Sequence, residues 1–160
     1  MRVDNIRAFA VEVPQAAIDD LKDRLARTRW PERETVDDWD QGIPLAYAQE
    51  LAAYWRDKYD WRVVEARLGA FPNYLATIDG LDIHFLHVRS ANPDARPLVL
   101  THGWPGSVLE FLDVIEPLAA DYHLVIPSLP GYGFSGKPTE AKWSVEHIGA
   151  AWDALMQALG

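Results

Sequence analysis

The sequence predicts an α/β protein in which a helical amino-terminal meander precedes the first part of a core of strands and helices. Three observations predict this class. Apolar side chains recur at helical spacing early in the chain, Asp79-Gly80 separates two strand-like runs, and an apolar run at 97–101 precedes a helix start signal. The order after the meander is a hairpin followed by β-α-β-α, as in α/β folds. We therefore predict two regions, residues 1–72 and 73–160.

Two amphipathic helices are predicted in the first region. One covers residues 14–28, where Pro14 suits the first turn, and Pro44 opens the other after an irregular connection over residues 30–42. Apolar side chains share one face of each helix: Ile18, Leu21 and Leu25 in the first, and Tyr47, Leu51, Tyr54 and Trp55 in the second. A shorter helical piece is expected over residues 62–68.

A β-hairpin opens the second region. Its strands are predicted over residues 74–78 and 81–88. Asp79-Gly80 between them is the combination that best supplies the positive φ angles of a type I′ turn. The uninterrupted apolar run at 98–100 then predicts a strand that is buried on both faces, as in a parallel sheet.

Two helices and one strand complete the predicted elements. Ser107 and Glu110 form a capping-box pattern at the start of the first helix. Residues 123–127 are predicted as the next strand, and Ser144 caps a last helix that ends at Gly160. Such a sheet is expected to continue with another strand after Gly160.

The composition excludes several classes of function. The 160 residues include 15 Lys and Arg against 24 Asp and Glu, and the net charge of −9 repels phosphate backbones and anionic membranes. No nucleic-acid partner is therefore expected. The absence of Cys excludes disulfides and thiolate sites, and residues 1–7 lack the long apolar run of a signal peptide or membrane anchor. We expect a soluble, cytoplasmic protein with no membrane partner.

The clearest functional motif follows the apolar run and comprises His102, Gly103, Trp104, Pro105 and Gly106. It resembles the oxyanion loop of an α/β-hydrolase, in which backbone N–H groups stabilise negative charge on a carbonyl oxygen. Gly103 lets the backbone approach the site, and Pro105 fixes the bend, with a cis Trp104–Pro105 bond as one way to do so. We predict that Trp104 supplies its backbone N–H and that the other four residues support it. The alternative is a tight turn without function.

His102 is a candidate general base, but hydrolases of this fold place the catalytic His last in the chain. We therefore expect His102 to be buried, hydrogen-bonded and structural. The other four histidines have no partner at metal-ligand spacing, so no metal site is predicted: His84, His87, His123 and His147. His84 and His87 should face opposite sides of one strand.

Two further patterns are judged not to carry chemistry. Residues 131–136 fit the dinucleotide pattern GxGxxG, but Pro130 and Pro138 bracket them and no helix opens directly behind them. No dinucleotide is expected. Ser135 imitates the first half of a nucleophile elbow, but Lys137 stands where the second Gly is needed. We expect Ser135 to be a loop residue.

Five segments together resemble one known family. They are residues 28–31, 54–62, 78–85, 101–107 and 127–135. In this order they are similar to the microsomal-type epoxide hydrolase family, including the amino-terminal region that precedes its catalytic core. The resemblance implies an epoxide-hydrolase-type helical region over residues 1–72. It implies the first part of an α/β-hydrolase core over residues 73–160, which ends before the nucleophile elbow.

The resemblance also implies a reaction. An Asp attacks an epoxide carbon to form an ester while two Tyr residues assist the leaving oxygen, and a His paired with an acidic residue activates water to release a vicinal diol. Trp104 matches a catalytic contributor of the family through its N–H. The nucleophile, acid, base and Tyr residues are expected after Gly160. No cofactor is implied, and the partners are a small-molecule epoxide and water, in a detoxifying role.

Three functions are weighed. The first is the amino-terminal portion of an epoxide hydrolase, whose carboxyl-terminal part lies in the same or a second chain, with a homodimer left open. The second is another α/β-hydrolase that acts on a haloalkane or an ester. The third is a non-catalytic module that binds another protein through an exposed sheet edge. We favour the first and expect the isolated chain to hydrolyse no epoxide.

Overall fold

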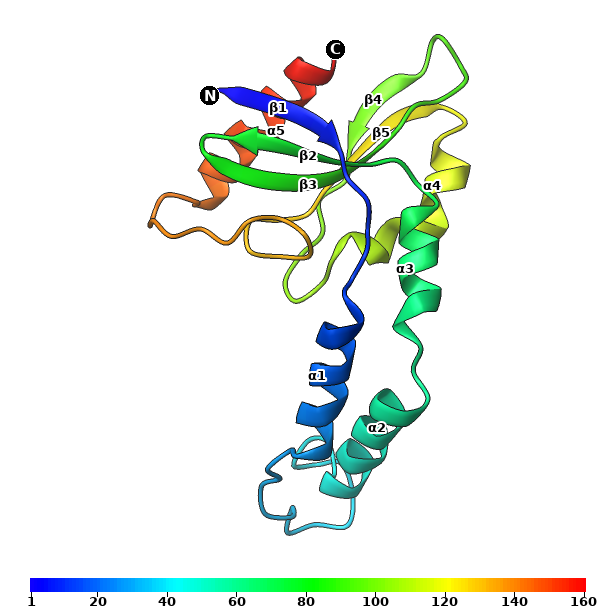
Figure 1. Cartoon of the computed structure of the whole chain (residues 1–160), viewed down its shortest axis with the longest axis vertical. Coiled ribbons are helices and arrows are strands. Elements are labelled where there is room, and N and C mark those ends of the chain that lie inside the picture. Colours follow the sequence, from blue (N-terminus) through cyan, green and yellow to red (C-terminus); the bar gives the residue numbers. More distant parts are fainter. The chain divides into compact units, whose positions relative to one another are not determined.

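A computed structural model describes residues 1–160 as two compact units (Figure 1). The sheet unit comprises Met1–Val11 and Ala66–Gly160, and the helical unit comprises Glu12–Glu65. The first strand of the sheet therefore comes from the extreme amino terminus, before the helical unit begins. The proposed domain boundary at residue 72 stays a prediction.

The helical unit contains the predicted pair of helices. Helix α1 spans Gln15–Ala26 and helix α2 spans Leu45–Asp57, and Pro14 and Pro44 occupy the position before each. Proline suits a helix start because its φ is fixed and the N–H that it lacks would have no partner within the helix. Helix α3, Trp61–Gly69, begins in this unit. All three predicted helices of the meander are confirmed.

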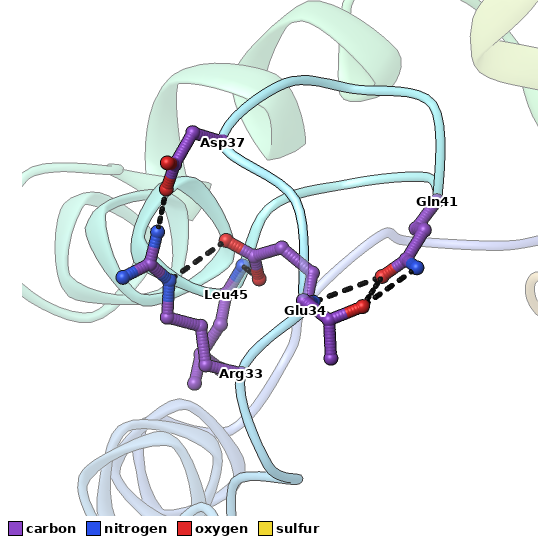
Figure 2. A network of polar contacts seen from close by, with 6 residues as sticks. Arg33, Glu34, Asp37, Gln41 and Leu45 are labelled. Carbon is purple, nitrogen blue, oxygen red and sulfur yellow. Dashed lines mark hydrogen bonds and ion pairs between the residues drawn. The ribbon is translucent and has the colours of Figure 1, made fainter.

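The connection between α1 and α2 is ordered by polar contacts (Figure 2). The Leu45 N–H donates to Glu34 Oε2 at 2.8 Å, and this carboxylate serves the first turn of α2, where Pro44 offers no side-chain cap. Arg33 pairs with Asp37 and lies 3.5 Å from Glu34. The Leu45 N–H is the main reason that the pKa of Glu34 lies below its usual value.

The sheet unit is built on one mixed sheet of five strands in the order β1-β2-β3-β5-β4. The strands are β1 Val3–Ala8, β2 Asn73–Ile78, β3 Leu81–Val88, β4 Arg96–Val99 and β5 Tyr122–Pro127. The pairs β1–β2, β2–β3 and β3–β5 are antiparallel, and β4–β5 is parallel. The predicted hairpin is confirmed, with Asp79 at φ 49° and Gly80 at φ 84° in the turn.

Two features of the sheet differ from prediction. The sequence pattern predicts no strand over β1, because three of its six residues are polar and they do not alternate with the apolar ones. In the structure Asn5 has φ 50°, and the register shifts between Asp4 and Arg7. The expected burial of the strand at 98–100 on both faces is wrong. Strand β4 lies at the edge of the sheet, so Leu98 and Val99 are only half-buried.

Each face of the sheet is covered by helical structure. Helix α5, Val145–Leu159, packs on one face, and its buried residues share a cluster with the sheet: Ala76, Ile78, Ile83, Phe85, Val125, Ala151, Trp152 and Leu155. The other face is covered by a 3₁₀ turn, Val108–Phe111, that continues into α4, Leu112–Leu118. Its cluster comprises Val11, Leu68, Leu86, Val108, Leu112, Ile115, Leu124 and Ile126. No helix has the length and apolar character needed to cross a membrane.

Candidate functional site

The motif loop lies where two parallel strands end. Strands β4 and β5 run in the same direction, so the loops that follow them emerge at the same edge of the sheet. His102 follows β4 and Leu129 follows β5, and the Leu129 N–H donates to His102 Nε2 at 3.0 Å. One hydrogen bond therefore joins the two loops.

The motif forms a tight turn. The Gly106 N–H donates to the Gly103 carbonyl at 2.8 Å, and the Trp104–Pro105 bond is cis, which defines a type VI turn. The cis isomer is one of the ways considered for Pro105 to fix the bend. The residue at its tip, Trp104, is 83% exposed. Its backbone N–H donates to no acceptor of the chain, so the turn leaves this donor unused.

The absence of a side chain at Gly106 has a structural reason of its own, which lies in the helix cap that follows. A Cβ atom at this position would lie 1.4 Å from Glu110 Oε1. That oxygen accepts from the Ser107 N–H at 3.2 Å, while the Ser107 Oγ accepts from the Leu109 N–H at 3.3 Å. The predicted capping box is confirmed, although it opens a 3₁₀ turn and not the α-helix directly. The last glycine of the motif thus makes room for the helix cap.

His102 is buried and both of its ring nitrogens are engaged. Its exposed fraction is 3%, and Tyr132 packs edge-on against it with ring centroids 5.4 Å apart. Because the Leu129 N–H can only donate, Nε2 is the acceptor and the proton resides on Nδ1, 3.1 Å from the Gly103 carbonyl. A ring nitrogen that already accepts a hydrogen bond from a backbone N–H has no free lone pair with which to abstract a proton from water. The arrangement confirms a buried, hydrogen-bonded residue, as predicted.

A second buried histidine was not expected to matter. His84 on β3 is completely buried, with Nε2 2.8 Å from Asn73 Oδ1 and Nδ1 2.9 Å from Ser128 Oγ. Asn73 Nδ2 donates to two backbone carbonyls, so its Oδ1 faces His84 and accepts from Nε2–H. Burial lowers the pKa of His84 to about 4. The imidazole is neutral at pH 7 and belongs to the core. As predicted, His87 faces the opposite side, where it packs beside Tyr74.

The segment after β5 forms a loop and not a helix. Ser135 lies in this loop, as predicted, but it is buried. Its Oγ accepts from the His84 N–H at 3.0 Å and donates to the Ser128 carbonyl at 2.8 Å. Gly133 has φ 52°, and a Cβ there would lie 3.0 Å from Ser128 Oγ. Ser128, Gly133 and Ser135 are close in sequence, but His84 meets them only in the fold, so the sequence pattern alone does not show this contact.

The helical unit holds an apolar groove of about 600 Å³ between α1 and α2. Its lining is almost entirely apolar: Val13, Ala17, Ile18, Leu21, Lys22, Leu51, Tyr54, Trp55, Tyr59 and Trp61. None of these residues is a predicted site residue. No group of three or more His, Asp or Glu side chains is placed to hold a metal ion.

The sheet order, the helices on both faces and the loop after β4 define a class, the first part of an α/β-hydrolase fold. The family model described as alpha/beta hydrolase fold matches residues 96–160. A second model, described as Epoxide hydrolase N terminus, matches residues 6–111, which is more than half of the chain. The chain belongs to the epoxide hydrolase family that this model represents.

Known proteins of this family align along almost the entire chain. A Stigmatella aurantiaca protein named "Putative epoxide hydrolase" is 55% identical over 97% of the chain, and Epoxide hydrolase 1 of Oryctolagus cuniculus is 33% identical over 98%. The solved structure of Aspergillus niger epoxide hydrolase covers 98% of the chain with a TM-score of 0.88 and 34% identity. The chain spans 38% of the length of the first two proteins and 44% of the third. It corresponds to the amino-terminal portion of an epoxide hydrolase.

Proposed function

We propose that this chain supplies one half of the oxyanion hole of an epoxide hydrolase, through the backbone N–H of Trp104. The observation that carries the proposal is the unused Trp104 N–H at the tip of the turn after β4. His102, Gly103, Pro105 and Gly106 hold that turn. Membership of the epoxide hydrolase family supports this function over a haloalkane or ester hydrolase and over a non-catalytic module.

The proposed donor acts when the covalent intermediate is hydrolysed. A carboxylate first attacks an epoxide carbon, the C–O bond opens, and the alkoxide takes a proton to become a hydroxyl. Water then gives a proton to a base and adds to the ester carbonyl, whose oxygen becomes negative. Collapse of this intermediate breaks the bond to the diol oxygen, which takes up a proton, and the carboxylate is regenerated. A fixed N–H stabilises that oxygen without reorganising in the transition state. Trp104 lies in the loop that follows β4, at the end of the sheet where the parallel strands β4 and β5 terminate.

The remaining groups are assigned to the rest of the enzyme. In α/β-hydrolases the second N–H of the oxyanion hole belongs to the residue after the nucleophile. We propose that a carboxyl-terminal part supplies that N–H, the nucleophile, the water-activating His and the Tyr residues. The substrate is a small-molecule epoxide. The isolated 160-residue chain is expected to release no diol from styrene oxide, and measurable turnover would refute this division of labour.

The test uses a fusion of this chain to the remaining part of the Stigmatella aurantiaca relative. Two replacements at Trp104 separate the side chain from the backbone. The α-hydroxy analogue of tryptophan keeps the indole but replaces the N–H by oxygen, and we expect kcat for styrene oxide to fall by roughly 10²–10³. Trp104→Ala keeps the N–H and is the matched control, with kcat expected within about threefold of the unmodified fusion, because the same donor remains.

Two results would contradict the proposal. One is an α-hydroxy variant that retains the kcat of the fusion while its circular dichroism matches that of the parent. The other is a loss in Trp104→Ala as large as the loss in the α-hydroxy variant, since that would assign the effect to the indole.

A further inference from the structure

We propose that Ser135 is a positioning residue that orients the Trp104 N–H through two rigid peptide groups and the ring of His102. The functional meaning of this role rests on the oxyanion function proposed above. Ser135 lies in the glycine-rich loop at 131–136, whose dinucleotide-like pattern has no part in that chemistry. Its hydroxyl is nevertheless buried, with one acceptor and one donor in fixed places.

The first rigid group is the peptide that joins Ser128 to Leu129. The Ser135 hydroxyl donates to the carbonyl of this group at 2.8 Å, and the N–H of the same group donates to His102 Nε2 at 3.0 Å. A trans peptide is planar, with its carbonyl and N–H pointing in opposite directions. The direction of the carbonyl therefore sets the direction of the N–H that reaches His102.

The imidazole of His102 passes this orientation to the motif. With Nε2 occupied by the Leu129 N–H, the ring proton resides on Nδ1 and points to the Gly103 carbonyl, 3.1 Å away. The same carbonyl accepts from the Gly106 N–H at 2.8 Å. Two donors thus fix the direction of the Gly103 carbonyl.

The second rigid group joins Gly103 to Trp104. This peptide is trans, because the cis bond of the turn is the next one, between Trp104 and Pro105. The Gly103 carbonyl points toward His102 Nδ1 and the Gly106 N–H. The Trp104 N–H of the same peptide therefore points in the opposite direction, where no acceptor of the chain meets it. Ser135, more than thirty residues away in sequence, thereby acts on the proposed oxyanion donor.

Ser135 is itself held from two sides. Its Oγ accepts from the N–H of His84 in the centre of β3, and its own N–H donates to the Tyr132 carbonyl at 2.9 Å. Ser128 is held in turn by His84, to which it donates its N–H at 2.8 Å and its hydroxyl at 2.9 Å. We call the series of contacts from Ser135 through the peptide group at 128–129 and His102 to the Gly103 carbonyl the relay. Strand β3, through His84, anchors its Ser135 end.

The first measurement determines which ring nitrogen of His102 carries the proton, that is, the tautomer of the ring in the 160-residue chain at pH 7. Nitrogen-15 shifts of the histidine side chains distinguish an Nδ1–H ring from an Nε2–H ring. The relay requires the Nδ1–H form. A ring protonated on Nε2 would overturn the proposal, whatever the role of Trp104.

The second measurement is amide hydrogen exchange of Leu129 relative to that of Ile126 in β5. Ser135→Ala removes the hydrogen bond to the Ser128 carbonyl and also the one accepted from the His84 N–H. Because only the first bond leads to Leu129, we expect Leu129 to exchange about fivefold faster relative to Ile126, the effect of one neutral hydrogen bond. A general loss of stability would accelerate both amides alike. Ser135→Thr keeps the hydroxyl and should restore the ratio, and Ser144→Ala, which removes the cap of α5, should leave it unchanged.

If Ser135→Ala does not fold, Ser135→Cys takes its place, because a thiol fills the site but donates only weakly. An unchanged Leu129 ratio in the folded variant would overturn the proposal. Neither measurement uses enzyme activity. Failure of the relay therefore shows in the exchange data, whereas failure of the proposed function shows in the kcat of the Trp104 variants.

Discussion

Every residue of the buried apolar core belongs to the sheet unit, whereas no residue of the helical unit is fully buried. The sheet unit contains two clusters of buried apolar side chains, one on each face of the sheet. Helices α1 and α2 instead leave apolar side chains partly exposed along their shared groove. Side-chain burial therefore stabilises one unit far more than the other.

The helical unit relies on polar contacts at the ends of its helices. Glu34 accepts from the first N–H of α2, and Glu65 accepts from the Val13 N–H at 2.6 Å while pairing with Arg62. Short helices are marginal in water without tertiary packing. The comparison indicates that local sequence signals can specify helices whose stability has to come from elsewhere.

The largest expected effect tests the core directly. Phe85→Ala removes a completely buried ring from the sheet unit and should lower the free energy of unfolding by about 3–5 kcal/mol. Leu51→Ala in α2 changes a side chain that is 53% exposed and should cost about 0.5 kcal/mol or less. Urea denaturation measures both. Equal losses in the two variants would show that the helical unit has a core of its own.

Acid should affect the two units in different pH ranges. Burial lowers the pKa of His84 from 6.5 to about 4, so the folded sheet unit binds fewer protons than the unfolded chain between these values. The contribution of neutral, buried His84 to the stability is fully present above pH 6.5 and is lost as the pH falls toward 4, which lowers the free energy of unfolding by up to about 3 kcal/mol. Burial also lowers the pKa of His87, which therefore adds to the same slope. Denaturation at several pH values gives this slope.

Two variants identify the group responsible for the acid slope. His84→Gln removes the titrating ring and should flatten most of the slope between pH 6.5 and 4, although stability at pH 7 also falls. Phe85→Leu changes a buried neighbour of His84 on β3 that carries no ionisable group, and it should leave the slope in place. A slope that persists unchanged in His84→Gln would refute the assignment.

The smallest effect is expected in the helical unit at lower pH. Hydrogen bonds from backbone N–H groups are the main reason that the pKa values of Glu34 and Glu65 lie below 4.5. Their contribution is present above pH 4.5 and is lost as the pH falls through the lowered pKa values. Glu34→Gln should speed exchange of the Leu45 amide and reduce this acid step. The exposed Glu32→Gln is the control, and an equal response in both would contradict the cap.

Local signals in the sequence predicted most of the secondary structure. Asp79-Gly80 specifies its hairpin because the turn needs positive φ at both positions, and Pro14 and Pro44 mark helix starts because proline fixes φ. The capping box at Ser107 works in the same way. Each of these signals acts within a few residues, so it can be recognised without knowing the fold.

The features that were missed depend on distant neighbours. The half-burial of β4 follows from its place at the sheet edge, which the apolar run at 98–100 does not encode. His84 has no partner nearby in sequence, and its hydrogen bonds reach Asn73 and Ser128 across the fold. The motif at 102–106 predicted where the turn lies. The role of Ser135 needs the peptide group at 128–129, which only the three-dimensional structure brings to His102.

The two outer strands of the sheet also govern how the chain behaves in concentrated solution. An open strand edge is a template for pairing with another molecule. At one edge, Asn5 breaks the regular ladder of β1, and at the other, β4 has only four residues, of which Pro97 has no N–H to donate and Arg96 carries a charge. A strand from a neighbouring molecule thus finds few consecutive donors and acceptors on either side. The backbone of β1 and β4 therefore disfavours edge-to-edge pairing of this five-stranded sheet with a second copy of itself.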